Sequence, residues 1–257
     1  MHLNLYLRTA ACLFAAATSA WGASVCPTAS AREIPPTQLS VQYGNVLGKG
    51  IQKVTLTAVY ENKGLYAKQV TVCVKDMETE VSLCFSPEQN AGYYPAILLA
   101  DFTGDGTQEI FLGMDSGGSG GFGFYYIFSL EGGKVSTLFD FNTFPGYFEA
   151  AYADNYRVNV SDSRSEGQYT IDLSSRDREY LSAIYNNDGQ LRRPLHADVS
   201  GVHSVLPFFV NRDNRYHLLI MQRITGLYNA DVLGYTQEFL RFDSDSFVPY
   251  FTAVAIV

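Results

Sequence analysis

Helical periodicity, histidine, tryptophan and the local motifs of common hydrolases are all scarce in this sequence. The chain has four histidines and one tryptophan. It contains neither a Gly-x-Ser-x-Gly nucleophile turn nor a His-Glu-x-x-His zinc motif. These absences exclude the serine hydrolases and zinc proteases that carry those motifs. They do not exclude glycoside hydrolysis, because its two carboxylates come together only in the fold.

Basic residues are also few. The chain has 18 Lys and Arg against 26 Asp and Glu, and its net charge is −8. An acidic chain is repelled by the phosphates of nucleic acid and by anionic membrane surfaces. We therefore expect no nucleic-acid partner, and cations are the more natural small partners. Beyond the N-terminal region no segment is long and apolar enough to span a membrane, so we expect no membrane insertion.

The N-terminal segment has the three-part layout of a secretory signal peptide. One basic residue, Arg8, precedes an apolar stretch over 9–21 and then small residues. Cleavage sites of the small-x-small type follow Gly22 and Ala31. We expect a signal peptide over 1–22, with cleavage as late as residue 31, and a single all-β domain over 32–257. This predicts a secreted or cell-surface protein; the alternative for the first segment is a buried N-terminal helix.

Short strand-like segments are abundant. Runs such as KVTLTAVYE (53–61), bounded by Gly, Asn, Asp or Ser, recur about every 8–12 residues and number about fourteen. The 18 tyrosines and 17 phenylalanines favour strands and a well-filled core. Only SSRDREYLSAIYNNDG (174–189) predicts a short helix, which the Asn-Asp-Gly sequence ends. The pattern predicts an all-β fold.

Two cysteines fall opposite each other if 68–87 forms a hairpin with a two-residue turn at Glu78-Thr79. In that register Cys73 faces Cys84. The same register gathers four apolar residues on the opposite face: Val72, Val74, Leu83 and Phe85. Directly opposed residues in such a pair are about 4.5 Å apart at Cα, which a disulfide can bridge. We predict a Cys73–Cys84 disulfide, with two free thiols as the alternative in a reducing compartment.

The stretch ADFTGDGTQEIFLG (100–113) resembles a calcium-binding loop in its spacing. Oxygen-bearing side chains occupy positions 1, 3, 5 and 9, a glycine follows at position 6, and a backbone carbonyl is available at position 7. The expected ligands are Asp101, Thr103, Asp105, Thr107 and Glu109. An EF-hand is excluded because position 12 is Leu112 and a strand follows. The alternative is an Asp-rich turn whose carboxylates accept backbone N–H groups.

The segment AILLADFTGDGTQEIFLGMDSGGSGGFGFYYIFSL (96–130) resembles an FG-GAP or VCBS-type repeat, the unit of integrin-alpha-like β-propellers. QNAGYYPAILLADFTGDG and QRITGLYNADVLGYTQEFLRFD extend a similarity to uncharacterised secreted bacterial VCBS-repeat proteins. The resemblance implies a β-propeller-like array of about four or five blades, with a β-sandwich as the alternative. It also implies calcium loops within the blades. A second copy at 209–222 has Asn211 and Asp213 at the ligand positions but lacks the outer carboxylates, so we expect it to hold no ion.

These features predict a secreted, calcium-stabilised β-repeat module of the binding or adhesion type. The expected ligand is a glycan, a wall polymer or a protein. The alternatives are a secreted carbohydrate-active hydrolase and a structural protein of an envelope or coat. Two carboxylates roughly 5–9 Å apart in a deep cleft would favour the hydrolase. An aromatic-rich, shallow surface would favour binding, and self-assembly would favour the structural protein.

Overall fold

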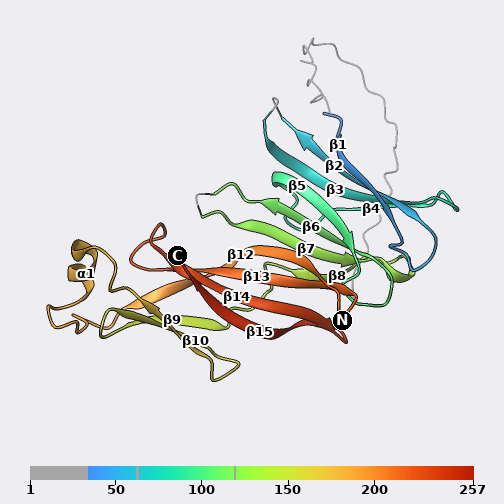
Figure 1. The fold of residues 1–257 in the computed structure, drawn as a ribbon. Coiled ribbons are helices and arrows are strands. Elements are labelled where there is room, and N and C mark those ends of the chain that lie inside the picture. The colour runs from blue at the N-terminus through green and yellow to red at the C-terminus, as the bar shows by residue number, and fades with distance from the viewer. Residues whose placement is uncertain (1–33, 62–63, 119) are drawn as a thin grey trace, which may run out of the picture. The chain divides into compact units, whose positions relative to one another are not determined.

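Two antiparallel sheets and one short helix make up the described part of the chain (Figure 1). The computed structural model describes residues 34–61, 64–118 and 120–257. The predicted signal peptide therefore lies outside the described residues. Residues Ile34–Val257 form one unit by their contacts. Within the described ranges, no helix has the length and apolarity needed to cross a membrane.

The first sheet has eight strands in the order β1-β2-β3-β5-β6-β7-β8, and β4 pairs with β3 off this path. β3 pairs with β5 at Tyr66 and Ala67. Farther along the same edge, residues 72–75 of β3 pair with β4. The elements are β1 (Thr37–Gly44), β2 (Gln52–Tyr60), β3 (Tyr66–Asp76), β4 (Ser82–Phe85), β5 (Gly92–Ala100), β6 (Glu109–Asp115), β7 (Gly123–Ser129), the single turn η1 (Glu131–Gly133) and β8 (Ser136–Asp140).

The second sheet has seven strands in the order β11-β10-β9-β12-β13-β14-β15. It is strongly curled and nearly closed, because its two end strands meet: the Tyr169 hydroxyl on β11 donates to the Thr252 carbonyl on β15 at 3.1 Å. The elements are β9 (Phe148–Ala153), β10 (Arg157–Asp162), β11 (Gln168–Asp172), α1 (Arg178–Ile184), β12 (His196–Val210), β13 (Arg215–Thr225), β14 (Val232–Asp243) and β15 (Ser246–Ile256).

Alternation of apolar and polar residues along the strands produces three clusters of buried side chains. One fills the first sheet around Leu56 and Ile110, and another fills the second sheet around Val160 and Ile224. The third joins the two sheets through residues such as Phe102, where β7 and β8 contact β12 and β15. Fully burying one such aliphatic or aromatic side chain contributes about 1.5–3 kcal/mol.

The predicted β-propeller is wrong, although the all-β class holds. A propeller needs separate four-stranded blades around a channel, whereas here the strands form two continuous ladders of eight and seven strands. The sandwich alternative does not describe the arrangement either, because each sheet has a core cluster of its own. The predicted helix over 174–189 is confirmed as α1, which Asp177 caps by accepting a hydrogen bond from the Tyr180 N–H.

Candidate functional site

The acidic loop over 101–109 joins β5 to β6. Gly104 and Gly106 both have φ above +80°, the left-handed region that glycine adopts without strain. The two carboxylate oxygens of Asp101 accept hydrogen bonds from these glycines, at 2.6 Å from the Gly104 N–H and 3.0 Å from the Gly106 N–H. Asp105 accepts from the Thr107 N–H at 2.7 Å. These contacts hold the loop in a tight turn.

Glu109 closes the loop from inside the protein. Its side chain is only 1% exposed. One carboxylate oxygen accepts from the Phe102 N–H at 2.7 Å and from the Thr103 N–H at 3.2 Å. No ion pair is formed by Glu109 among the described residues. Burial, only partly offset by these hydrogen bonds, raises the pKa of Glu109 to about 7, so its carboxyl group needs a proton or a cation near neutral pH.

The structure brings together three of the five predicted calcium ligands. The Thr103 hydroxyl lies 3.5 Å from an Asp101 carboxylate oxygen and 3.2 Å from a Glu109 carboxylate oxygen. Asp105 instead turns to the N–H of Thr107. In the described ranges no group of three or more His, Cys, Asp or Glu is arranged to hold a metal ion. The contacts follow the alternative interpretation, an Asp-rich turn, and calcium stays a prediction that requires Asp105 to rotate.

The predicted second copy lies directly against the first loop. It forms the turn between β12 and β13, where Asn214 has a left-handed φ of 51°. From this turn the Tyr216 N–H donates to the Asp101 carbonyl at 2.7 Å, and Arg215 donates to the Thr103 carbonyl at 3.1 Å. Asp213 does not face the loop ligands but lies 3.0 Å from His217. The sequence similarity of the two turns gave no signal for this contact.

The hairpin of β3 and β4 contains the Cys73–Cys84 disulfide. The two cysteines face each other in the ladder, in the register that the alternation of apolar residues predicts. The connection is wider than the predicted two-residue turn, because the ladder ends at Lys75 and Ser82. Asp76 stabilises the wider connection by accepting from the N–H groups of Thr79 and Glu78. Hydrogen bonds from Thr79, the Gln52 amide and Glu78 lower the pKa of Asp76 to about 2.

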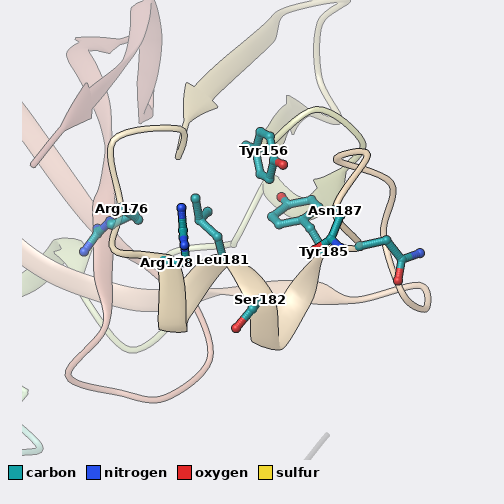
Figure 2. A pocket seen from close by; sticks show the side chains of 8 residues that line it. Tyr156, Arg176, Arg178, Leu181, Ser182, Tyr185 and Asn187 are labelled. Atoms are coloured by element: carbon teal, nitrogen blue, oxygen red, sulfur yellow. The ribbon is translucent and has the colours of Figure 1, made fainter.

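A pocket of about 610 Å³ lies beside α1, and sequence reasoning missed it (Figure 2). Its aromatic side is formed by Tyr156 and the buried Tyr185, whose ring centres are 4.9 Å apart. Leu181 and five polar side chains complete the lining: Arg176, Arg178, Ser182, Asn186 and Asn187. The one local signal in the sequence was the predicted helix itself. Tyr156, in the connection that leads to β10, lies at least twenty positions before every other lining residue.

Tyr156 has an unusual backbone. It follows Asn155 in the connection between β9 and β10. Both residues have a left-handed φ, which is 65° for Asn155 and 60° for Tyr156. Asn tolerates this region, but a bulky residue such as Tyr is an outlier there. Such strain is kept where the surrounding structure enforces it and is common at functional sites. Here it directs the Tyr156 ring to the pocket.

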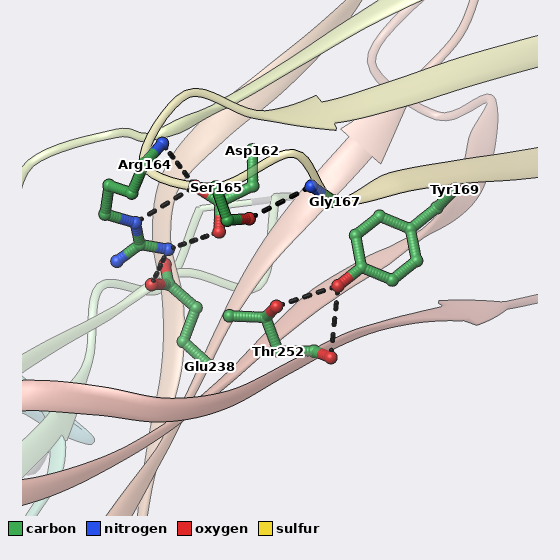
Figure 3. A network of polar contacts seen from close by, with 7 residues as sticks. All are labelled: Asp162, Arg164, Ser165, Gly167, Tyr169, Glu238 and Thr252. Atoms are coloured by element: carbon green, nitrogen blue, oxygen red, sulfur yellow. Dashed lines mark hydrogen bonds and ion pairs between the residues drawn. The ribbon is translucent and has the colours of Figure 1, made fainter.

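A buried ionic network crosses the second sheet (Figure 3). Arg164, in the turn between β10 and β11, donates to both carboxylate oxygens of Asp162 at 3.0 Å and pairs with Glu238 on β14. Asp162 is 4% exposed and Glu238 is fully buried. Burial raises the pKa of Glu238 although Arg164 opposes it. Burial would also raise the pKa of Asp162, but Arg164 holds it below its usual value.

This network does not have the form of a hydrolytic acid pair. Both carboxylates are bound to the same guanidinium, which lies over the Tyr147 ring at 4.0 Å. Two carboxylates neutralised in this way are not free to protonate a ligand or to activate water. The network joins the β10–β11 turn to β14 and so keeps the sheet curled.

Comparison with known proteins gives one family. A family model described as the YybI C-terminal domain matches residues 146–255, which span nearly all of the second sheet, α1 and the pocket beside it. The protein described as "Uncharacterized protein YybI" from Bacillus subtilis (strain 168) is 32% identical over 208 residues, which are 80% of this chain and 79% of that protein. A match of that length extends into the first sheet. No solved structure matches the chain.

The expected relationship to FG-GAP and VCBS-type repeat proteins is therefore wrong. The similarity rested on residues 96–130 and on two further segments, QNAGYYPAILLADFTGDG and QRITGLYNADVLGYTQEFLRFD. Its most specific feature was an acidic Gly turn between two strands, and such a turn occurs in more than one fold. The repeat architecture and the propeller that the resemblance implied are overturned with it.

Proposed function

This chain belongs to the YybI family, and for this member we propose an exported binding module that holds a polar ligand in the pocket beside α1. The ligand class is a glycan or wall polymer. The pocket falls within the residues that the family's domain model matches. Export rests on the signal-peptide layout of residues 1–22.

The observation that carries this proposal is the strained Tyr156 at the pocket. A turn with two consecutive residues at φ above zero is usually built from Asn-Gly or Gly-Gly. Tyr in the second position is unfavourable for the backbone, so we infer that the residue is kept for its ring. The ring packs edge to face on Tyr185 at 4.9 Å and leaves its other side at the pocket.

The remaining lining suits a polar ligand. Arg178, Asn186 and Asn187 are exposed and supply N–H donors and amide oxygens at the rim. The volume of about 610 Å³ lies within the range of natural ligand sites, about 300–1,000 Å³. An apolar ligand would need a more enclosed and less polar wall. A sugar or a short wall-polymer segment offers an apolar ring face that can pack on the tyrosine ring. It also offers hydroxyl groups that can hydrogen-bond to the asparagine amides.

The test compares two substitutions of the same kind. Tyr156→Gly removes the ring and relieves the backbone, whereas Tyr94→Gly does the same to an exposed tyrosine with φ of 50° on β5, in the other sheet. Binding is measured by affinity electrophoresis in gels that contain soluble polysaccharides and by pull-down on insoluble wall polymer. We expect wild type and Tyr94→Gly to be retained on one polymer and Tyr156→Gly to lose retention.

Two results would contradict the proposal. The first is that the wild-type protein is retained by no polymer of the panel. The second is that Tyr156→Gly and Tyr94→Gly are retained equally. Release of soluble sugar from the retained polymer would point to the hydrolase alternative instead.

We also propose that the loop over 101–109 takes a calcium ion as a stabilising ligand. The support is the buried Glu109, which has no ion-pair partner among the described residues and whose carboxylate approaches the same Thr103 hydroxyl as the Asp101 carboxylate does. Asp101, Thr103, Asp105, Glu109 and the Thr107 carbonyl are the donors available. The threonine at position 3 and the missing glutamate at position 12 suggest an affinity on the order of 10⁻⁴ to 10⁻³ M.

Thermal unfolding with calcium and with chelator tests this second proposal. At a hundredfold excess over Kd, calcium stabilises the folded state by about 2.7 kcal/mol, so chelation should lower the Tm. Asp105→Ala should abolish the difference, because it removes a donor while the hydrogen bonds of Asp101 and Glu109 remain. If wild type melts at the same temperature in both conditions, the loop is only an acidic turn.

A further inference from the structure

Arg223, on β13, lies between loops from both sheets. Its side chain is 9% exposed. One terminal nitrogen donates to the Gly120 carbonyl at 3.1 Å, in the Gly-rich connection between β6 and β7. The other donates to the Asn229 carbonyl at 2.8 Å, in the connection between β13 and β14. The guanidinium also lies 5.7 Å from the Phe122 ring centre. These contacts fix its position.

The contacts leave the Arg223 side chain incompletely satisfied. A guanidinium has five N–H donors, and two of them have acceptors here. The Nε atom is buried without a hydrogen-bond partner. No carboxylate of the described residues lies within ion-pair distance of Arg223. Buried charges are normally paired, because removing an isolated charge from water is costly.

A pocket of about 370 Å³ opens beside this guanidinium. Besides Arg223 and Phe122, its lining includes Ser200 and Asp198 on β12, Thr225 on β13 and the exposed Asn229. Gly120 shapes it as well: a Cβ there would clash with the Phe122 ring, so a larger residue would displace the ring that forms the aromatic wall. The pocket combines the unpaired guanidinium of Arg223, one carboxylate at Asp198, neutral polar groups and one aromatic wall.

We propose that this pocket binds a small polar molecule through an oxyanion, a carboxylate or phosphate group, that pairs with Arg223. The planar fork of N–H groups on arginine matches two oxygens of such a group. A bound oxyanion would supply the missing negative charge and would accept from the terminal N–H groups of Arg223 that have no acceptor here. The pocket is larger than a single ion, so the oxyanion is carried on a body of about the size of a monosaccharide, with Asn229 at its side.

Asp198 gives this proposal a second, opposite test. It is an exposed carboxylate in the pocket lining and forms no ion pair among the described residues. A like charge in the same pocket opposes anion binding. Asp198→Asn keeps the size of the side chain and removes that charge, so it should strengthen binding, whereas Arg223→Gln should weaken it.

The experiment is calorimetric titration of the full chain with glucuronate, glucose and inorganic phosphate. Glucuronate and glucose differ in the carboxylate, and phosphate tests the other source of an oxyanion. We expect glucuronate or phosphate to bind and glucose not to bind. Arg223→Gln should weaken the binding at least about tenfold, since hydrogen bonds to a charged group are lost. Asp198→Asn should tighten it, and Tyr156→Gly, in the other pocket, should leave it unchanged.

The outcomes separate a binding site from a purely structural arginine. Because Arg223 also joins two loops, the Tm of Arg223→Gln is measured alongside, and Asp198→Asn leaves those loop contacts intact. The proposal is overturned if wild type binds neither glucuronate nor phosphate at about 10 mM, where a Kd near 1 mM would be seen. It is equally overturned if Asp198→Asn fails to tighten the binding. If Tyr156→Gly loses polymer retention but binds glucuronate as the wild type does, the pocket at α1 and the pocket at Arg223 are separate binding sites.

Discussion

At the scale of single residues, Glu109 determines how the acidic loop responds to pH. The pKa of its buried carboxyl is about 7, against 4.5 for an ordinary glutamate. Between these values the folded state keeps a proton that the unfolded state has lost. The free energy of unfolding therefore falls as the pH rises from about 4.5 to 7, by up to about 1.4 kcal/mol per pH unit for one group.

Glu109→Gln isolates this effect, because the amide stays neutral at every pH and still offers an oxygen to the Phe102 N–H. In chelator, urea unfolding between pH 5 and 8 should show the wild type losing stability relative to the variant as the pH rises. The difference between the two proteins cancels the titration of other groups. Parallel pH profiles for wild type and Glu109→Gln would show that the pKa of Glu109 is not raised.

Arg164 is the second residue with an effect beyond its own contacts. Arg164→Leu would leave the buried carboxylates of Asp162 and Glu238 without their cation. Breaking a buried ion pair by removing one partner costs about 3–5 kcal/mol. The double variant Arg164→Leu with Glu238→Leu removes the more deeply buried charge too, so we expect it to be more stable than the single variant. Urea unfolding of both proteins measures this, and an equal or larger loss in the double variant would contradict it.

At the scale of elements, β4 depends on its disulfide. It is a four-residue strand, mostly exposed, that pairs with β3 off the main path of the sheet. A strand this short gains little from its ladder or from burial. The covalent link between Cys73 and Cys84, eleven positions apart, therefore holds it in place.

Reduction of the disulfide should release β4 while the rest of the first sheet keeps its core. Closing a loop of this size contributes roughly 2–4 kcal/mol. Hydrogen exchange followed by mass spectrometry should show loss of protection in 82–85 after reduction, with β2 and β6 unchanged. Cys73→Ser should behave like the reduced protein. Unchanged protection in 82–85 would mean that hydrogen bonding alone holds the strand.

The elements also show what a sequence can predict here. Alternation of apolar residues placed the strands and the register of the β3–β4 hairpin, and helical spacing placed the short helix, because each depends on residues close in the chain. The acidic loop likewise forms the turn that its glycines require. The pocket at α1 could not be predicted, since only the fold brings Tyr156 and Arg178 to the same pocket. Nor could the Arg164–Glu238 pair, whose partners are more than seventy positions apart.

At the scale of the whole molecule, the predicted β-propeller had the right kind of strand but the wrong topology. Local similarity of one loop to a repeat unit implied blades, but nothing local decides whether β8 continues a sheet or starts a new one. Here β8 continues the first sheet by pairing with β7. The third core cluster, in which Phe102 and Phe139 from the first half pack with Leu218 and Leu240 from the second, then joins the two sheets. That cluster makes the two sheets one unit of contacts.

Phe102 provides a test of this unity. It is fully buried, lies in the acidic loop and packs against Tyr216 and Phe247 of the second sheet. Phe102→Ala should cost about 3–5 kcal/mol, because a cavity opens where the two sheets meet. If the sheets unfold together, the slowest-exchanging amides of β2 and of β13 should lose protection by the same amount. Val54→Ala, in the cluster of the first sheet alone, serves as the matched variant. Should Val54→Ala lower protection in β2 while β13 keeps its own, the sheets would be separate folding units, and the shared cluster would be only an interface between them.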